Sequence, residues 1–239
     1  MAATAEAAWS TNYLKNNIHP LYRIEPLWRK VSFMINVLGS IPNKVAVAVS
    51  GGSDSMAVLD FLSRSNRELL VLYFNHGTEF SNDAEVFVKN YCENREIKLE
   101  VGRTTRNRYK SESQEEYWRN ERYGFFSNFL DRKIITCHHL NDAIETWLFT
   151  SIHGNPRLIP YSRENFIRPF LSTEKSVLSL WCERKGVPYL EDPSNSDLSY
   201  MRNLIRHELM KSVLKVNPGI KKVIRKKVNL MYKETVDRI

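Results

Sequence analysis

Cysteine is scarce in this chain: 239 residues include only three, Cys92, Cys137 and Cys182. The three are odd in number and far apart, which excludes a Cys-x-x-Cys metal or redox pair. Sparse, unpaired cysteine is typical of proteins kept in a reducing compartment, so we expect a cytoplasmic location.

Long hydrophobic runs are missing as well. No stretch approaches the roughly 18 consecutive apolar residues that a membrane-spanning helix needs. Residues 1–17 (MAATAEAAWSTNYLKNN) lack the basic start and apolar segment of a secretory signal. The sequence therefore predicts no membrane association. With 42% hydrophobic and 26% charged residues, the chain can build one compact core.

Two common phosphate-binding patterns are also absent, the Walker A motif ending in Gly-Lys-Ser/Thr and the Gly-x-Gly-x-x-Gly fingerprint. Residues 50–55 (SGGSDS) offer another solution, because they follow the apolar run at residues 44–49 (KVAVAV) and precede a predicted helix. Gly51 and Gly52 allow positive φ and close approach of the backbone to a ligand. Amides at the start of the helix attract anions. We interpret the segment as a phosphate-binding loop; the alternative is an ordinary Gly-Gly turn.

Asp54 is an unusual residue for such a loop, because phosphate repels a carboxylate. Mg²⁺ prefers carboxylate and phosphate oxygens together. Asp54 is therefore a candidate metal ligand.

The excess positive charge lies in residues 202–239. These residues hold 11 Lys and Arg against 3 Asp and Glu, and the resulting +8 equals the net charge of the whole chain. A concentrated basic segment is typical of contact with a nucleic-acid backbone. The alternative is a solvated tail.

Apolar runs alternate with helical patterns along most of the chain. Besides residues 44–49, strands are predicted at residues 69–74, 97–101 and 133–137, and helices at residues 25–38, 56–62, 82–94, 113–130, 141–152 and 175–185. The alternation predicts an α/β fold with a doubly wound, mainly parallel sheet. Two further helices, separated by residues 217–219 (NPG), predict a small helical C-terminal extension.

Three parts are expected from this pattern. Residues 1–22 form an N-terminal arm, residues 23–200 a nucleotide-binding domain, and residues 201–239 a basic helical C-terminal segment. In such sheets ligands bind at the carboxyl ends of the strands. Residues 50–55, His76 and His138 all follow predicted strands.

Acidic and imidazole side chains gather around the helix at residues 141–152. Asp142 and Glu145 are three residues apart and share one face. They can position an ammonium group or accept its proton, or they form a solvated helix start. The adjacent His138 and His139 point to opposite sides of an extended segment, so one of them, rather than a metal-binding pair, is expected near a substrate.

Several arginines also recur at helical spacing. Arg119 and Arg122 share a face and either meet phosphate or lie in solvent. Arg202 and Arg206 are one turn apart and, with the basic last helix, are candidates for contact with RNA phosphates. His76 is either a nucleotide contact or a packed structural residue. The five tryptophans are expected in the core or at its edges.

The segments above, taken in order, resemble the PP-loop ATP pyrophosphatases and, more closely, the tRNA(Ile)-lysidine synthetase family. Residues 50–55 match the Ser-Gly-Gly-x-Asp-Ser signature. Residues 137–146 (CHHLNDAIET) are similar to the segment HHxDDQxET, and Arg119, Arg122 and Tyr123 to an Ala-Arg-x-x-Arg-Tyr helix. Residues 168–169 (RP), 191–195 (EDPSN) and 202–206 (RNLIR) resemble further family segments.

The resemblance implies a two-step reaction with ATP and Mg²⁺. ATP is split between its α and β phosphates, and AMP is placed on the C2 oxygen of the wobble cytidine in a CAU-anticodon isoleucine tRNA. The ε-amine of L-lysine then displaces AMP and forms lysidine.

It also implies roles for particular residues. Catalysis falls to Asp54, Asp142, Glu145 and His138, and Asp54 also holds the metal. ATP binding falls to Ser50, Gly51, Gly52, Ser53, Asp54, Ser55, His76 and Arg119. Contact with tRNA falls to Arg168, Asn195, Arg202, Arg206, Lys222, Arg225 and Lys226.

The sequence departs from the family pattern within residues 137–146, and the glycine-rich stretch expected near residues 151–160 is reduced to residues 153–156 (HGNP). Asn141 stands where the pattern has its first acidic residue, and Ala143 where it has Gln. Larger members carry further C-terminal domains, so we expect fewer tRNA contacts here, or contacts supplied by a homodimer or a helper subunit. Two alternative functions follow. One is another PP-loop enzyme such as a tRNA thiolase, for which Cys137 is the candidate thiol. The other is a catalytically degenerate protein that binds RNA or a partner.

Overall fold

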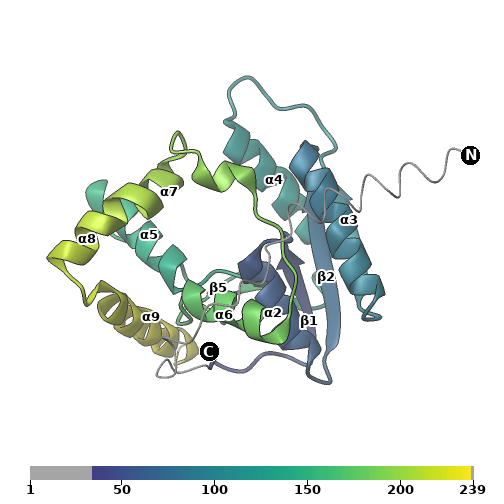
Figure 1. Ribbon diagram of the computed structural model, residues 1–239, viewed down its shortest axis with the longest axis horizontal. Helices are drawn as coiled ribbons and strands as arrows, with labels where there is room; N and C mark the ends of the chain where they lie inside the picture. The colour runs from purple at the N-terminus through teal and green to yellow at the C-terminus, as the bar shows by residue number, and fades with distance from the viewer. Residues whose placement is uncertain (1–33, 238–239) are drawn as a thin grey trace, which may run out of the picture.

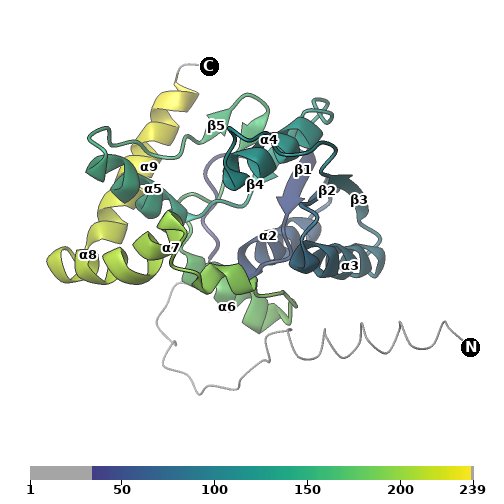
Figure 2. The ribbon, with the colours of Figure 1, turned by 90° about the horizontal axis from the view of Figure 1, so that it is seen from above.

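A computed structural model describes residues 34–237, which form a sheet with helices packed on both faces (Figures 1 and 2). The strands are β1 (Lys44–Val49), β2 (Glu68–Asn75), β3 (Lys98–Arg103), β4 (Lys133–Thr136), β5 (Ser162–Arg163) and β6 (Phe166–Ile167). The helices are α2 (Ser53–Ser63), α3 (Glu79–Glu93), α4 (Gln114–Phe126), α5 (Leu140–Ile152), α6 (Lys175–Lys185), α7 (Met201–Leu204), α8 (Met210–Val216) and α9 (Ile220–Val236), with a 3-10 turn η1 (Pro193–Ser196) and a π turn η2 (Ile205–Leu209).

The strand order is β3-β2-β1-β4-β6-β5. Neighbouring strands run parallel, apart from the antiparallel pair β5 and β6. The predicted α/β fold with a mainly parallel sheet is confirmed. Strands β2 and β3 lie on one side of β1, whereas β4 lies on its other side, so the direction in which the chain adds strands reverses at β1. The segments that follow β1 and β4 therefore meet at the edge formed by the carboxyl ends of the strands.

Strand β1 is almost wholly apolar because it contacts a hydrophobic core on each face of the sheet. Val45, Val47 and Val49 point into the core formed with α2, α3 and α6. Ala46 and Ala48 point to the opposite core, which α4 covers. Because alternate side chains face opposite sides, a central parallel strand is buried on both.

A further core joins α5 to the C-terminal helices, which lie together on one side of the molecule (Figure 1). Ile220, Ile224 and Val228 of α9 are buried against Ile144 and Leu148 of α5. Burial of each such side chain contributes about 1.5–3 kcal/mol. The basic segment is therefore anchored on α5 by its apolar stripe.

The structure differs from the predicted elements at several ends. Residues 34–38 of the helix predicted at residues 25–38 are not helical, because the amide of Leu38 bonds the Pro169 carbonyl and Thr173 bonds the Asn36 carbonyl. The rest of that helix and the arm at residues 1–22 lie outside the described residues. Helix α4 ends at Phe126, earlier than predicted, and Ser113 caps it.

The C-terminal helices also differ in detail. A π turn, η2, interrupts the helix predicted before residue 217, and Val216, the last residue of that helix, is 87% exposed although it is apolar. The hairpin β5–β6 is too short to leave a sequence signal. Within residues 34–237, no helix is long and apolar enough to cross a membrane.

Candidate active site

The loop at residues 50–55 lies between β1 and α2 and leaves the start of α2 open. Gly52 is the N-cap and supplies no side-chain cap, so the first amides of α2 have no side-chain acceptor. Ser55 donates its hydroxyl to the Gly52 carbonyl and accepts from the Ser50 amide. These bonds fix the loop around an open helix N-terminus, the arrangement that binds phosphate.

Gly51 holds this loop in a left-handed conformation, with φ of 87°. A Cβ at this position would meet the Ala84 Cβ at an ordinary 3.5 Å, so the backbone angle rather than crowding requires glycine. We expect Gly51→Ala to lower the free energy of unfolding by about 1–2 kcal/mol and to weaken ATP binding. Urea unfolding and calorimetry with ATP measure both effects.

Gly124→Ala is the matched control. Gly124 lies inside α4, and nothing is within 4 Å of an added Cβ. This exchange should raise stability by roughly 0.5–1 kcal/mol and leave ATP binding unchanged. If Gly51→Ala were as harmless as Gly124→Ala, the proposed role of the positive φ would be wrong.

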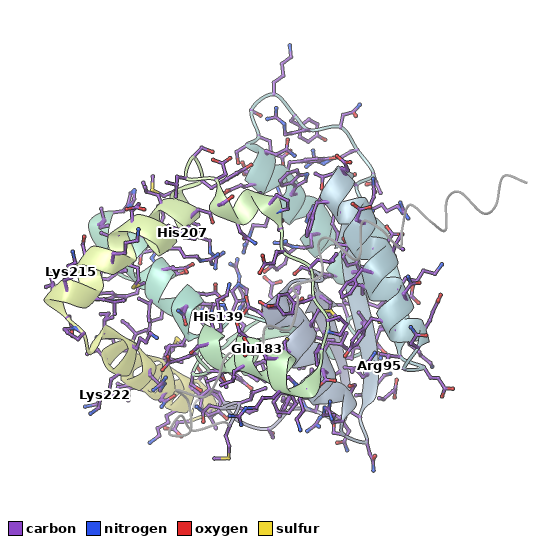
Figure 3. The ribbon with its side chains drawn as sticks, viewed as in Figure 1. Arg95, His139, Glu183, His207, Lys215 and Lys222 are labelled. Atoms are coloured by element: carbon purple, nitrogen blue, oxygen red, sulfur yellow. The ribbon has the colours of Figure 1, made fainter. Side chains whose placement is uncertain are left out.

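An imidazole joins the loop to α5. His139 is the N-cap of α5, and Figure 3 shows it near the centre of the molecule. Its Nε2 atom lies 3.3 Å from Oδ2 of Asp54, and its Nδ1 atom lies 3.3 Å from Oδ2 of Asp142. The Nζ atom of Lys175, at the start of α6, lies 3.5 Å from the same Asp54 oxygen.

Two arginines close the network from the C-terminal side. Arg202 donates to Oδ1 of Asp142 at 2.7 Å and to Oε2 of Glu145 at 3.2 Å. Arg206 donates to the two oxygens of Glu145 at 2.8 and 3.1 Å. Asp142 and Glu145 are buried, whereas Arg202 is exposed. Charged contacts therefore run without a break from Asp54 to Arg206.

These contacts favour the charged forms of Asp54, Asp142 and His139. Burial raises the pKa of Asp54, but the hydrogen bond and charge of His139 and the charge of Lys175 bring it below its ordinary value. Burial likewise raises the pKa of Asp142, and His139 and Arg202 outweigh it, so this pKa is also lowered. Burial lowers the pKa of His139, yet Asp142 and Asp54 together raise it above its ordinary value.

The charge of His139 gives stability a definite pH dependence. Because its pKa is raised in the folded protein, its stabilisation is fully present below the ordinary value of 6.5 and is lost as pH rises through the folded-state pKa. We expect His139→Gln to destabilise the protein most at about pH 5.5 and progressively less towards about pH 9. The lowered pKa values of Asp54 and Asp142 make stability depend on pH only in the acid range, below these pH values. Urea unfolding across this range measures the difference; a gap that widened with pH would contradict the assignment.

A cavity of about 580 Å³ lies beside the network. Its lining comes from α4, α5, α7 and the segment after β2: His76, Ser113, Glu115, Glu116, Trp118, Arg119, Arg122, Glu145, Thr146, Phe149, Met201, Arg202 and Ile205. This volume is within the range of small-molecule sites. Glu145 and Arg202 belong to both features, so the network forms one wall of the cavity.

The α4 wall carries charges of both signs, and its two arginines have no ion-pair partner among the described residues. Neither Arg119 nor Arg122 forms an ion pair with a carboxylate of residues 34–237. Burial lowers the pKa of Arg122, and Arg119 and Arg202 lower it further. Burial and Arg122 also lower the pKa of His76 to about 4, so His76 is neutral at neutral pH. The two arginines on this wall can therefore pair with an anionic group.

The other residues predicted from the sequence lie apart from the cavity. Arg168 is buried and donates to the Pro160 carbonyl, and Arg225 donates to Glu174. Lys222 and Lys226 are exposed on α9, and Figure 3 shows Lys222 at the outer surface. Asn195 is exposed, with its carbonyl bonded to His207.

His138 and His139 separate as their alternating directions predict. The Nδ1 atom of His138 lies 2.9 Å from the Thr136 hydroxyl, and burial lowers the pKa of His138 to about 4. The imidazole that bridges the two aspartates is that of His139. The catalytic histidine expected from the resemblance is His138, whereas the contacts with both aspartates belong to His139, because the sequence shows alternation but not its direction.

The sequence does not single out Lys175 or Trp118. Lys175 reaches Asp54 only because α6 packs against α2. Asn141 has a structural contact of its own, since its side-chain oxygen accepts the Lys175 amide at 3.1 Å. It thereby caps the start of α6. The residue that departs from the family pattern thus helps to place Lys175.

A doubly wound sheet with this loop after β1 defines a PP-loop nucleotide-binding domain. The family model described as "PP-loop domain" matches residues 26–213. A tRNA(Ile)-lysidine synthase of Thermotoga sp. (strain RQ2) is 32% identical over 204 residues, covering 79% of this chain and 49% of that protein. The corresponding protein of Petrotoga mobilis is 32% identical over 216 residues, covering 82% of this chain and 69% of that protein.

The chain therefore belongs to the PP-loop domain family and, within it, to the tRNA(Ile)-lysidine synthase family. It spans about half the length of the first curated relatives that it matches. Among solved structures, an NH3-dependent NAD synthetase from Campylobacter jejuni is 14% identical, covering 79% of this chain and 85% of that chain, with a TM-score of 0.44. That similarity is too low to support a functional inference.

Proposed function

We propose that this chain is the catalytic part of an enzyme that forms lysidine in a CAU-anticodon isoleucine tRNA. The C2 oxygen of the wobble cytidine attacks the α-phosphorus of ATP and releases pyrophosphate. The ε-amine of L-lysine then attacks C2, AMP leaves, and the amine loses a proton. The observation that carries the proposal is the unbroken chain of contacts from Asp54 in the phosphate loop to Glu145 in the cavity wall.

The phosphate loop and Asp54 serve the first step. Oδ1 of Asp54 is buried and has no hydrogen-bond partner among the described residues. A free carboxylate oxygen beside a phosphate site fits Mg²⁺, which is commonly held by one or two carboxylates and by phosphate oxygens. Asp54 would hold the ion, which would neutralise charge on the phosphate oxygens.

Asp142 and Glu145 serve the second step. An ammonium group must lose a proton before its nitrogen attacks, and a carboxylate within hydrogen-bond reach accepts that proton. Arg202 and Arg206 hold both carboxylates in place. Because Arg202 is half exposed at the cavity, we propose that it also contacts the leaving AMP.

The basic surface of α9 serves RNA binding. Lys222 and Lys226 are exposed there, and exposed cations that follow a phosphate backbone position a substrate without reading its sequence. We propose that the protein acts in the cytoplasm, on this tRNA. A second copy or a helper subunit remains our proposed source of further tRNA contacts.

Sulfur transfer is a poorer explanation of the same fold. Cys137 bonds the Ala48 carbonyl, and burial raises the pKa of its thiol. A protonated, buried thiol is a weak nucleophile. Within residues 34–237, no group of three or more His, Cys, Asp and Glu side chains could hold a metal ion by itself, in contrast to Asp54, to which phosphate oxygens would add the other ligands.

The deciding experiment uses the full chain with ATP, Mg²⁺, L-lysine and an isoleucine tRNA transcript that carries a CAU anticodon. We expect pyrophosphate release and a lysine-sized mass increase on one cytidine in digested nucleosides. A methionine tRNA with the same anticodon tests whether the tRNA body is read. Tight tRNA binding without pyrophosphate release would favour the degenerate binding protein, and sulfur incorporation would favour a thiolase.

A further inference from the structure

The α4 wall of the cavity presents an indole ring that the mechanism above does not use. Trp118 is half-buried and lines the cavity, together with His76 and Phe149. Its ring centroid lies 5.3 Å from that of His76, with the two planes tilted by 45°. His76 in turn meets Phe74 edge-on at 5.1 Å. The indole of Trp118 therefore packs against His76, which packs against Phe74 of strand β2.

Trp118 has no polar role that would explain its position. Its ring makes no hydrogen bond within the part of the chain that the structure describes. Tryptophans that line a cavity without such a bond contribute a flat apolar surface. A flat surface of this kind recognises planar rings, including any nucleobase.

Two of the charges next to the indole, those of Arg119 and Arg122, match the phosphate of a nucleotide, although Glu115 and Glu116 line the same cavity. Arg119 follows Trp118 in the sequence and lies in the same cavity as Arg122, and neither guanidinium is neutralised by a carboxylate of residues 34–237. Both guanidinium groups contact the ring of Tyr123, at 4.7 and 5.9 Å. Arg119 is exposed, but Arg122 is half-buried, and a cation that has lost part of its solvation without gaining an ion-pair partner is costly. A ligand phosphate would remove that cost while its base stacks on the indole.

We propose that Trp118 is the stacking platform for a nucleobase in this cavity. The proposal rests on the proposed function, which supplies two sources of such a base, the adenine of ATP and the target cytosine of the RNA. Stacking on an aromatic side chain is sequence-tolerant, because every base has a π face. The shared chemistry is a nucleobase with an adjacent phosphate.

The test compares Trp118→Leu, Trp118→Phe and wild type. Leucine keeps an apolar side chain against His76 and a good helix former in α4 but removes the π face, whereas phenylalanine retains a smaller π face. Calorimetry measures ATP binding, and fluorescence anisotropy measures binding of a CAU anticodon stem-loop RNA. We expect Trp118→Leu to weaken one of the two by roughly 5- to 150-fold and Trp118→Phe to weaken it less.

Each outcome has a definite meaning. A loss confined to ATP identifies the base as adenine, and a loss confined to RNA identifies it as the target cytosine. Unchanged binding of both, or equal losses in Trp118→Leu and Trp118→Phe, would overturn the proposal. A wild-type protein that binds ATP and RNA but forms no lysidine would contradict the proposed function alone, because the stacking test measures binding. Urea unfolding of each variant identifies losses that arise from stability.

Discussion

Replacing Asp54 by asparagine should abolish most pyrophosphate release and leave RNA binding unchanged. The exchange removes the negative charge that faces the phosphate site and that holds His139 and Lys175 at 3.3 and 3.5 Å. Loss of one preorganised electrostatic contact in an active site costs about 10²–10³ in rate, and loss of the metal ligand adds to this. We therefore expect a decrease of at least about 100-fold, measured as pyrophosphate release at saturating ATP.

Glu79→Gln separates this effect from helix electrostatics. Asp54 and Glu79 are the acidic residues in the first turns of α2 and α3, respectively. If Asp54 acted only through the dipole of its helix, both exchanges would cost a few tenths of a kcal/mol and leave the rate unaltered. Equal rates of pyrophosphate release for Asp54→Asn and wild type would contradict the proposal that Asp54 and its loop form the catalytic phosphate site. The stem-loop RNA should bind both variants as it binds wild type.

Replacing Glu145 by glutamine should block the second step more than the first. Glu145 is buried, and Arg202 and Arg206 both bond its carboxylate. Glutamine retains the shape but cannot accept a proton, and proton transfer contributes about 10²–10⁴ in rate. We expect lysidine formation to fall by roughly that factor, while pyrophosphate release without lysine falls much less. Quenched time courses of pyrophosphate, AMP and lysidine measure the two steps separately.

Stability must be measured alongside, because Glu145 also neutralises two arginines. Loss of charged hydrogen bonds in a buried site costs about 1–3 kcal/mol, which urea unfolding would detect. Glu208→Gln is the matched control: Glu208 also pairs with a cation, Lys211, but it lies on the C-terminal helical segment and both side chains are exposed. It should affect neither step. A Glu145→Gln enzyme that forms lysidine at the wild-type rate would exclude Glu145 as the proton acceptor.

The central part of the fold could be predicted because its signals are local. The run at residues 44–49 must be apolar on both faces, since its alternate residues reach two different cores. Residues 50–55 could be read as a phosphate loop because the glycines, the hydroxyls and the following helix are contiguous. The two-residue strands β5 and β6 carry no such period, so their place in the sheet was not predictable.

Within the candidate site, the sequence by itself determined the residue types and the edge of the sheet at which they gather. It supplied Asp54 at the end of one strand, two histidines at the end of another, and Asp142 and Glu145 on one helical face. Only the tertiary structure decided their partners. Arg202 lies 57 residues from Glu145 along the chain, and Lys175 meets Asp54 only where α6 packs beside α2. Spacing reports which side chains share a face, whereas packing between distant elements decides which faces meet.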